Sequence, residues 1–451
     1  MAMQYYSTNR RAPEVSFREA LLGGQAPDRG LYLPVSIPKV SADELMSLQG
    51  LAYHQRAFEV LRRCLTGDDV PADVLAELTE DAYNFPVPLE QVYGRTYVMR
   101  LDQGPTASFK DFAARMMARL MNYYLAQERR KLVVLTATSG DTGGAIANAF
   151  FGLENIEVVI LFPREEVTAI QRRQMTTLGG NVRAISLEGK FDDCQALVKQ
   201  AFWDEDFSSF GLTSANSINI GRLLPQMVYY FHAWAELASS PEDKAVFSIP
   251  SGNFGNMMGA VLAKRMGLPI SKVVAATNEN DEFPVFYRTG GYEKIVPSIN
   301  CISSAMNVGH PSNLARLVDL YGGSMDEQGR LHMQPDLDAL RRDIYAVEIS
   351  DAQTRETMRT AWQRHQLLLE PHGAVGWLGL QQYAEEHPGE GRLQTVLETA
   401  HPAKFPEHIR EVLGIEAEAP ESMQGLEEAE ETYDSMEPDY SAFKAYLKRN
   451  V

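Results

Sequence analysis

The sequence predicts an open α/β fold with mostly parallel sheets, on two observations. Apolar runs such as LVVL (residues 132–135) and VVILF (residues 158–162) are continuous rather than alternating, which is typical of strands buried on both faces of a parallel sheet. Each run is followed by a loop and then by a helical pattern, as expected for right-handed βαβ units. Because open parallel sheets bind ligands at the carboxyl ends of their strands, we expect a site in the loops after these runs.

Five segments carry the pattern in turn, each starting with an expected strand: residues 131–151, 156–180, 182–202, 245–267 and 272–283. Before them, residues 1–95 are mostly polar and helical in pattern, and we expect an N-terminal, mainly helical domain there. A chain of 451 residues is too long for one small core. We therefore expect two or three domains in all.

The bulk composition indicates a soluble enzyme or binding protein of a reducing compartment. Hydrophobic residues make up 45% and charged residues 23%, and the net charge of −18 argues against nucleic-acid or anionic-membrane partners. Three distant cysteines form no disulfide framework, and the N-terminus lacks the apolar core of a signal peptide, so we expect a cytoplasmic protein. The acidic segment 415–439 is given no chemical role.

The loop SGNFGN, residues 251–256, directly follows an expected strand and opens a helix. Its glycines allow backbone N–H groups to turn inward, and the helix N-terminus adds a positive dipole, so the loop predicts a phosphate cradle. A tight strand-to-helix turn without a ligand is the alternative. The loop matches neither the GxGxxG fingerprint nor a P-loop.

The loop TATSGDTGGA, residues 136–145, is a second strand-to-helix connection, and it is rich in hydroxyl groups. Its side chains and backbone N–H groups are suitable for a carboxylate. Ser139 or Thr142 can instead simply cap the helix, but one cap needs one such residue, so we favour a binding role.

Two further segments offer polar groups near expected strand or helix ends. In SANSINIGR (residues 214–222), Arg222 lies in the first turn of a helix, where a cation opposes the helix dipole unless it holds an anion. Asn216 and Ser217 can share that anion, and a solvated arginine is the equal alternative. In LETAHPAKFP (residues 397–406), Thr399 can bond a ligand or merely close the turn.

Lys110 stands at the start of an expected helix in PTASFKDFAARMM, residues 105–117, between two phenylalanines. A lysine is unfavourable at a helix N-terminus. When desolvated and near other cations, however, it loses its proton readily, and the neutral amine forms Schiff bases. One such lysine, one phosphate cradle and one carboxylate loop are what pyridoxal 5'-phosphate requires, so we predict this cofactor. No metal site is predicted, since the histidines lack metal-ligand spacing.

These motifs carry a resemblance to the threonine synthase family, whose fold is the tryptophan-synthase-β-like pyridoxal-phosphate fold (fold type II). The resemblance runs almost end to end, and its motifs occur in the family's order: YYSTNRRAPEVSFREALLGGQAPDRGLYLP, PTASFKDFA, TSGDTGGA, SANSINIGR, SGNFGN, ATNEND, EPHGAVG and TAHPAKF. It implies two open, mostly parallel sheets flanked by helices. It also implies a large pyridoxal-phosphate-binding domain, residues 96–120 and 236–451, and a small substrate-binding domain, residues 121–235, inserted in the large one.

Carried over position by position, the resemblance implies that Lys110 forms the Schiff base and that Thr399 sits at the pyridine nitrogen. The phosphate cradle would be Gly252, Asn253, Phe254, Gly255 and Asn256. The groups around the substrate carboxylate would be Thr138, Ser139, Asp141 and Thr142. The groups on the substrate phosphate would be Asn216, Ser217 and Arg222.

Asp141 would also lie next to the cofactor's 3-oxygen, where related enzymes often carry asparagine. An ionised carboxylate is repelled by a phenolate oxygen. We therefore expect Asp141 either to turn away or to share a proton with that oxygen.

The resemblance implies a carbon–oxygen lyase that converts O-phospho-L-homoserine and water to L-threonine and phosphate, the last step of threonine biosynthesis. A monomer and a homodimer are both compatible with it. A dehydratase or phospholyase of the same fold is the nearest alternative, although a hydroxy amino acid needs no second anion site such as Arg222. A non-catalytic ligand-binding α/β protein is the alternative from another class, but it has no use for a reactive lysine.

Overall fold

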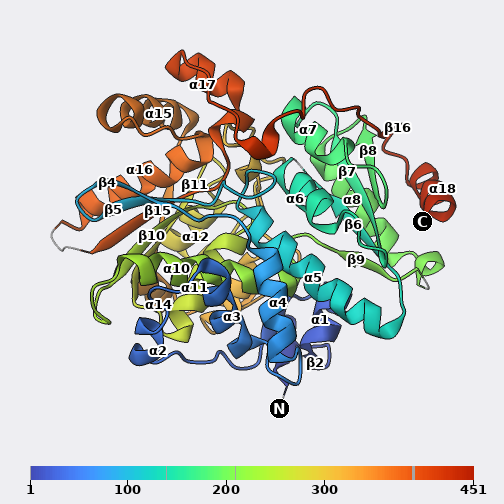
Figure 1. Cartoon of the computed structure of the whole chain (residues 1–451), viewed down its shortest axis with the longest axis horizontal. Helices are drawn as coiled ribbons and strands as arrows, with labels where there is room; N and C mark the ends of the chain where they lie inside the picture. The colour runs from blue at the N-terminus through green and yellow to red at the C-terminus, as the bar shows by residue number, and fades with distance from the viewer. Residues whose placement is uncertain (1, 139, 209, 389–391) are drawn as a thin grey trace.

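The computed structural model describes residues 2–138, 140–208, 210–388 and 392–451 of the chain. Among these residues, two open sheets lie side by side, one of six strands and one of five. Helices α5 (Lys110–Glu128) and α6 (Asp141–Phe150) lie near the middle of the molecule, between the two sheets (Figure 1). The predicted α/β fold with two mostly parallel sheets is confirmed.

The six-stranded sheet is parallel except at one edge, where β4 and β5 are antiparallel. Its strands in spatial order are β14 (Ile344–Glu348), β11 (Ile270–Thr277), β10 (Ala245–Pro250), β15 (Leu393–Glu398), β5 (Thr96–Arg100) and β4 (Leu89–Tyr93). Helix α16 (Pro371–Glu386) covers one face, and α10 (Val228–Leu237) and α11 (Gly255–Met266) cover the other. β4 belongs to this sheet, although we expected its residues in the N-terminal domain.

The five-stranded sheet is parallel throughout its described strands. In spatial order they are β16 (Asp434–Met436), β8 (Val182–Leu187), β7 (Ile156–Pro163), β6 (Leu132–Ala137) and β9 (Leu212–Ser214). Helices α6 and α7 (Ala169–Thr176) pack on one face, and α8 (Phe191–Trp203) and α18 (Tyr440–Asn450) pack on the other.

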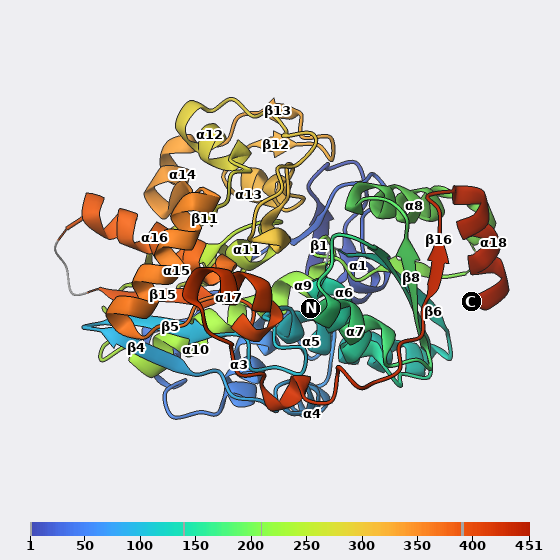
Figure 2. The ribbon, with the colours of Figure 1, turned by 90° about the horizontal axis from the view of Figure 1, so that it is seen from above.

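The C-terminal residues lie with the five-stranded sheet, whereas we predicted them within the large domain. β16 pairs with β8, and Figure 2 shows β16 and α18 beside β8 and α8. Tyr440 and Lys444 both contact a carboxylate oxygen of Asp204 at 2.7 Å. The acidic segment 415–439 contains this strand, and its Glu431 pairs with Arg172 of α7 at 2.9 Å. A three-residue strand at a sheet edge has no periodicity that a sequence can reveal.

The N-terminal residues hold helices, as predicted, and also a small antiparallel sheet that the helical pattern did not indicate. The helices are α1 (Phe17–Gly23), α2 (Ala42–Met46), α3 (Tyr53–Cys64) and α4 (Ala72–Ala82), and the strands are β1 (Gln4–Ser7), β2 (Val15–Ser16) and β3 (Tyr32–Pro34). The remaining elements are η1 (Glu205–Phe207), α9 (Ile220–Leu223), η2 (Leu224–Met227), α12 (Glu282–Thr289), η3 (Ser304–Met306), α13 (Leu314–Leu320), β12 (Ser324–Met325), β13 (Leu331–Met333), α14 (Leu337–Asp343), α15 (Asp351–His365), η4 (Pro402–Lys404), α17 (Pro406–Leu413) and η5 (Glu421–Met423). No helix in the described ranges is long and apolar enough to cross a membrane.

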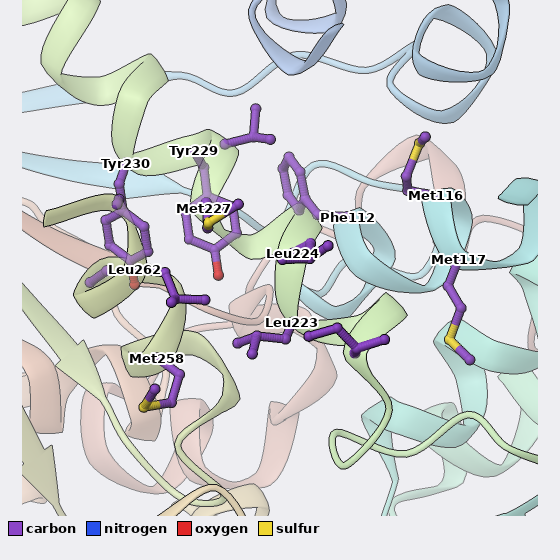
Figure 3. Packing of buried hydrophobic residues seen from close by; sticks show 14 of the residues in the cluster. Phe112, Met116, Met117, Leu223, Leu224, Met227, Tyr229, Tyr230, Met258 and Leu262 are labelled. Carbon is purple, nitrogen blue, oxygen red and sulfur yellow. The ribbon is translucent and has the colours of Figure 1, made fainter. Parts of the chain in front are cut away.

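One apolar core anchors the helices that begin at the predicted site. Figure 3 shows Phe112 of α5, Leu223 of α9, Tyr229 of α10 and Met258 of α11 packed in the same cluster. The rings of Phe112 and Tyr229 are 5.6 Å apart. Because all these side chains are fully buried, the first turns of α5, α9 and α11 are held in fixed positions relative to one another.

Candidate active site

Lys110 is the first residue of α5, and the loop before it is fixed against the end of β15. Ser108 and Ala400 form an antiparallel bridge, and the N–H of Phe109 donates to the carbonyl of Thr399 at 2.9 Å. These backbone bonds bring Lys110 and Thr399, which are far apart in the sequence, to one place at the carboxyl end of the six-stranded sheet.

The Lys110 amine lies in a largely enclosed setting of mixed charge. Its side chain is 14% exposed, and its Nζ is 3.6 Å from Oδ2 of Asp141 and 4.7 Å from the centre of the Phe109 ring. Burial lowers the pKa of Lys110, Asp141 opposes that shift, and the nearby cations Lys404 and Arg222 lower the pKa further. At a given pH, a larger fraction of Lys110 than of an exposed lysine is therefore in the neutral form that reacts with an aldehyde.

Asp141 begins α6 and is paired with a lysine from the other side of the site. Nζ of Lys404 is 2.8 Å from Oδ1 of Asp141, and Nε2 of Gln171 donates to the same oxygen at 3.0 Å. Burial alone would raise the pKa of Asp141, but Lys404 and Lys110 hold it well below its usual range. Asp141 thus points toward Lys110 as an ionised carboxylate balanced by Lys404, an arrangement that we did not predict. A glycine is needed at position 140 (φ 138°), because a Cβ there would lie only 2.5 Å from the side chain of Gln171, which bonds to Asp141.

The hydroxyl of Thr138 closes the loop between β6 and α6. Its Oγ1 accepts hydrogen bonds from the N–H groups of Gly140 and Gly143 at 3.0 and 2.8 Å. Thr138 therefore performs the capping role that we considered for Ser139 or Thr142. Thr142 is half-buried and lines the cavity described below, and Ser139 lies outside the described residues.

The SGNFGN loop has the geometry of an anion cradle. The N–H groups of Gly252, Asn253, Phe254 and Gly255 donate to no acceptor among the described residues. Phe254 has a left-handed conformation (φ 63°) that turns the chain into α11, so these donors gather at a helix N-terminus. The side-chain Nδ2 of Asn256 is also buried there, without a partner in the described parts of the chain.

Arg222 lies in the short helix α9 and is almost fully buried. Its Nη1 donates to the carbonyl of Ala215 at 2.7 Å, while its Nε has no partner among the described residues. Burial lowers the pKa of Arg222 to about 10, so it remains a cation at neutral pH. Oδ1 of Asn216 is likewise buried and unpartnered within the described ranges, and Ser217 is half-buried beside it.

A single cavity of about 650 Å³ brings the predicted site residues together. Among the residues that line it are all those predicted from the sequence and described by the structure: Lys110, Thr138, Asp141, Thr142, Asn216, Ser217, Arg222, Gly252, Asn253, Phe254, Gly255, Asn256 and Thr399. Within the described residues, no three His, Cys, Asp or Glu side chains are grouped so that they could hold a metal ion.

The residues in this cavity fit pyridoxal phosphate. Four free backbone N–H groups and the orphaned Asn256 amide match a phosphate, and a Cβ on Gly252 would lie only 3.0 Å from the Ala305 carbonyl, so the loop is as close-packed as a cradle requires. Lys110 supplies the amine, and the Thr399 side chain supplies a neutral hydroxyl at the strand end. The Nε of Arg222, which has no acceptor among the described residues, lies in a separate part of the same cavity.

Several residues that shape the site were not predicted. Lys404 pairs with Asp141, and the hydroxyls of Tyr229 and Tyr230 donate to Oδ1 of Asn256 at 2.6 and 2.5 Å, which leaves the Asn256 Nδ2 free for a ligand. The position of Lys404 between Ala403 and Phe405 is the sequence signal that could have suggested a buried lysine, but we drew no such inference from it.

Arg316 of α13 is another unpredicted residue, and it fixes the loop that carries Ser217. It is fully buried, and its guanidinium donates to the carbonyls of Tyr32, Ser217 and Ile218 at 3.0, 3.3 and 2.7 Å. A lone arginine in a helical segment gives no sequence signal of such contacts.

A reactive lysine, a phosphate cradle and a neutral hydroxyl at the end of a parallel strand define the site of a pyridoxal-phosphate-dependent enzyme. Residues 84–398 match the family described as pyridoxal-phosphate dependent enzyme, and residues 4–83 and 373–447 match threonine synthase N terminus and threonine synthase, C-terminal.

Relatives with the same organisation are known. The chain is 37% identical to threonine synthase of Haemophilus influenzae over 449 residues, covering 99% of this chain and 100% of that one, and 38% identical to that of Escherichia coli, covering 93% and 94%. The crystal structure of pyridoxal-phosphate-bound threonine synthase from Brucella melitensis superposes with a TM-score of 0.91 at 36% identity, covering 99% of each chain. The chain belongs to the threonine synthase family, and its cofactor is pyridoxal phosphate.

Proposed function

We propose that this enzyme converts O-phospho-L-homoserine and water to L-threonine and inorganic phosphate. The observation that carries the proposal is that unpartnered donors among the described residues lie at two separate places in one cavity with Lys110, one at residues 252–256 and one at Arg222. The first suits the cofactor phosphate and the second suits a phosphate on the substrate. A dehydratase acting on a hydroxy amino acid has no use for the second.

The cofactor would be held by Lys110, by the SGNFGN cradle and by Thr399. When bound, pyridoxal phosphate supplies an electron-withdrawing ring that stabilises negative charge on the α-carbon of the amino acid. The substrate carboxylate would lie against the loop that begins α6, where Thr142 lines the cavity at a helix N-terminus.

Lys110 would act as the base in the reaction. Its lowered pKa makes the neutral Nζ available, and this nitrogen would take the proton from the substrate α-carbon. Further proton transfer from the β-carbon then lets the phosphate leave from the γ-carbon, after which water adds at the β-carbon. Overall, the β-carbon exchanges a hydrogen for the hydroxyl of water, the γ-carbon exchanges the phosphate for a hydrogen, and the α-carbon regains its proton. Of the two protons released by the β-carbon and by water, one goes to the γ-carbon and the other leaves with the phosphate.

Arg222 would stabilise the charge that grows on the departing phosphate. Its Nε has no acceptor among the described residues, so this N–H is available to the phosphate. Electrostatic help is most effective on a group that gains charge in the transition state, in a site that excludes water. We expect the small domain to close on the substrate for that reason.

The test is to incubate the purified, cofactor-loaded protein with O-phosphohomoserine and to identify the products. L-threonine and phosphate in equal amounts support the proposal. A keto acid with ammonia would show instead a lyase of the same fold. A cytoplasmic location and a monomeric or dimeric assembly stay predictions.

A further inference from the structure

Lys404 is a fully buried lysine that the proposed mechanism does not use. It lies in η4, beyond the end of β15, and it is not among the residues that line the cavity. Its Nζ contacts two acceptors: Oδ1 of Asp141 at 2.8 Å and the carbonyl of Thr106 at 2.8 Å. A buried ammonium group is costly unless its charge is balanced and hydrogen-bonded, so these contacts explain how it is tolerated.

The contact joins the two halves of the site. Asp141 begins α6, which packs on the five-stranded sheet, while Lys404 and Thr106 belong to segments at the end of the six-stranded sheet. The other oxygen of Asp141 faces Lys110 at 3.6 Å. One carboxylate therefore stands between two lysines, and neither domain holds this arrangement alone.

The charged groups around Lys110 come from three elements. The anion that acts on Lys110 is Asp141 of α6, and the cations that act on Lys110 are Lys404 of η4 and Arg222 of α9. Asp111 of α5 also acts on Lys404, but its carboxylate is already bonded to the N–H and the hydroxyl of Thr106 at 2.8 and 2.6 Å. Asp141 thus divides its charge between Lys404 and Lys110.

We propose that Lys404 is a positioning residue that anchors Asp141 across the domain boundary and, by taking up part of its charge, governs the protonation of the Lys110 nitrogen. Without Lys404, the whole carboxylate charge is left to Lys110, which then holds a proton more tightly. Without the carboxylate, Lys110 faces cations only and holds a proton less tightly. The inference rests on the proposed role of Lys110 and does not depend on the substrate.

The two single variants should move the same quantity in opposite directions. In the cofactor-loaded protein, the absorbance of pyridoxal phosphate reports whether the Lys110 nitrogen carries a proton, and it can be followed from acid to alkaline pH. We expect Lys404→Met to raise the midpoint of this titration and Asp141→Asn to lower it. The two midpoints should differ by at least about one pH unit, a tenfold change in the protonated fraction ratio.

Two further variants separate this role from a purely structural one. Lys404→Arg keeps the cation and should restore the midpoint toward that of the unchanged protein. The double variant Asp141→Asn, Lys404→Met removes both charges, so its midpoint should lie between those of the two singles, because neither the anion that raises the midpoint nor the cation that lowers it remains. Lys272→Met is the matched control, since Lys272 contacts carbonyls of Arg341 and Arg342 and does not line the cavity.

A titration midpoint that is the same in Lys404→Met and Asp141→Asn would overturn the proposal, even if both variants lose thermal stability. A shift of the same sign in both would also overturn it. If the unchanged protein shows no absorbance of lysine-bound cofactor, the proposed role of Lys110 fails first, and the two failures are thereby distinguished.

Discussion

Replacing Arg222 by methionine tests the second anion site. Methionine retains an unbranched, apolar side chain in a buried position but removes the guanidinium. In the ligand-free protein the change has two opposing effects on stability: the Ala215 carbonyl loses its donor, and the cost of burying a cation disappears. We therefore expect the free energy of unfolding to change by no more than about 1 kcal/mol.

The effect on catalysis should be larger. Of the guanidinium donors, one already bonds to Ala215, and the buried Nε–H is free for a ligand. A hydrogen bond to a charged group is worth about 1.5–3 kcal/mol. One such bond to the departing phosphate corresponds to about 10- to 150-fold in kcat/KM, and a second bond would increase the loss further.

The assay compares kcat/KM for O-phosphohomoserine with the dissociation constant of pyridoxal phosphate in the same preparations. We expect kcat/KM to fall by about 10- to 150-fold. The dissociation constant of pyridoxal phosphate should change by less than about threefold, because the cofactor cradle lies on a different loop. Arg56→Met is the control: Arg56 is buried in α3, outside the cavity, and its loss should affect stability rather than catalysis. An equal loss of cofactor and substrate binding in Arg222→Met would refute the assignment.

Three further predictions follow from the same geometry. Lys110→Ala should remain folded but lose both the absorbance of lysine-bound cofactor and the activity; retained turnover would contradict the proposed base. Arg316→Met should free the loop at Ser217 and raise the KM for the phosphorylated substrate by about tenfold or more, and Arg316→Lys should not rescue it, because lysine lacks the planar fork; a normal KM in either variant would count against this role. Burial lowers the pKa of His232 to about 4, so between about pH 6.5 and 4 this histidine binds a proton in the unfolded protein but not in the folded one. The free energy of unfolding, measured with urea, should therefore fall by about 3 kcal/mol from pH 6.5 to pH 4, and by less in His232→Asn. Parallel pH profiles of the two proteins would show that another group is responsible.

The residues that the sequence identified are those whose role depends on local chain geometry. A phosphate cradle such as residues 252–256 is built by two closely spaced glycines and a helix start, so its pattern is visible in the sequence. Lys110 was identifiable because a lysine between two phenylalanines at a helix N-terminus conflicts with ordinary helix preferences. The continuous apolar strands β6, β7 and β10 were recognisable for the same local reason.

Residues whose role depends on distant contacts were missed. Lys404 was part of a recognised motif, but only its spatial neighbour Asp141 reveals what it does. Arg316 contacts carbonyls from two distant segments, which no spacing rule relates to it. The strand β16 is short and exposed, and it becomes a strand only because the edge of β8 is available to pair with it.

The most direct test of the account is to locate the lysine that binds the cofactor. The protein loaded with pyridoxal phosphate would be reduced with sodium borohydride, digested, and analysed by mass spectrometry for the modified peptide. The account predicts a single pyridoxyl adduct on Lys110, in the peptide that begins α5. An adduct on Lys404 or on any other lysine, or no adduct at all, would contradict it.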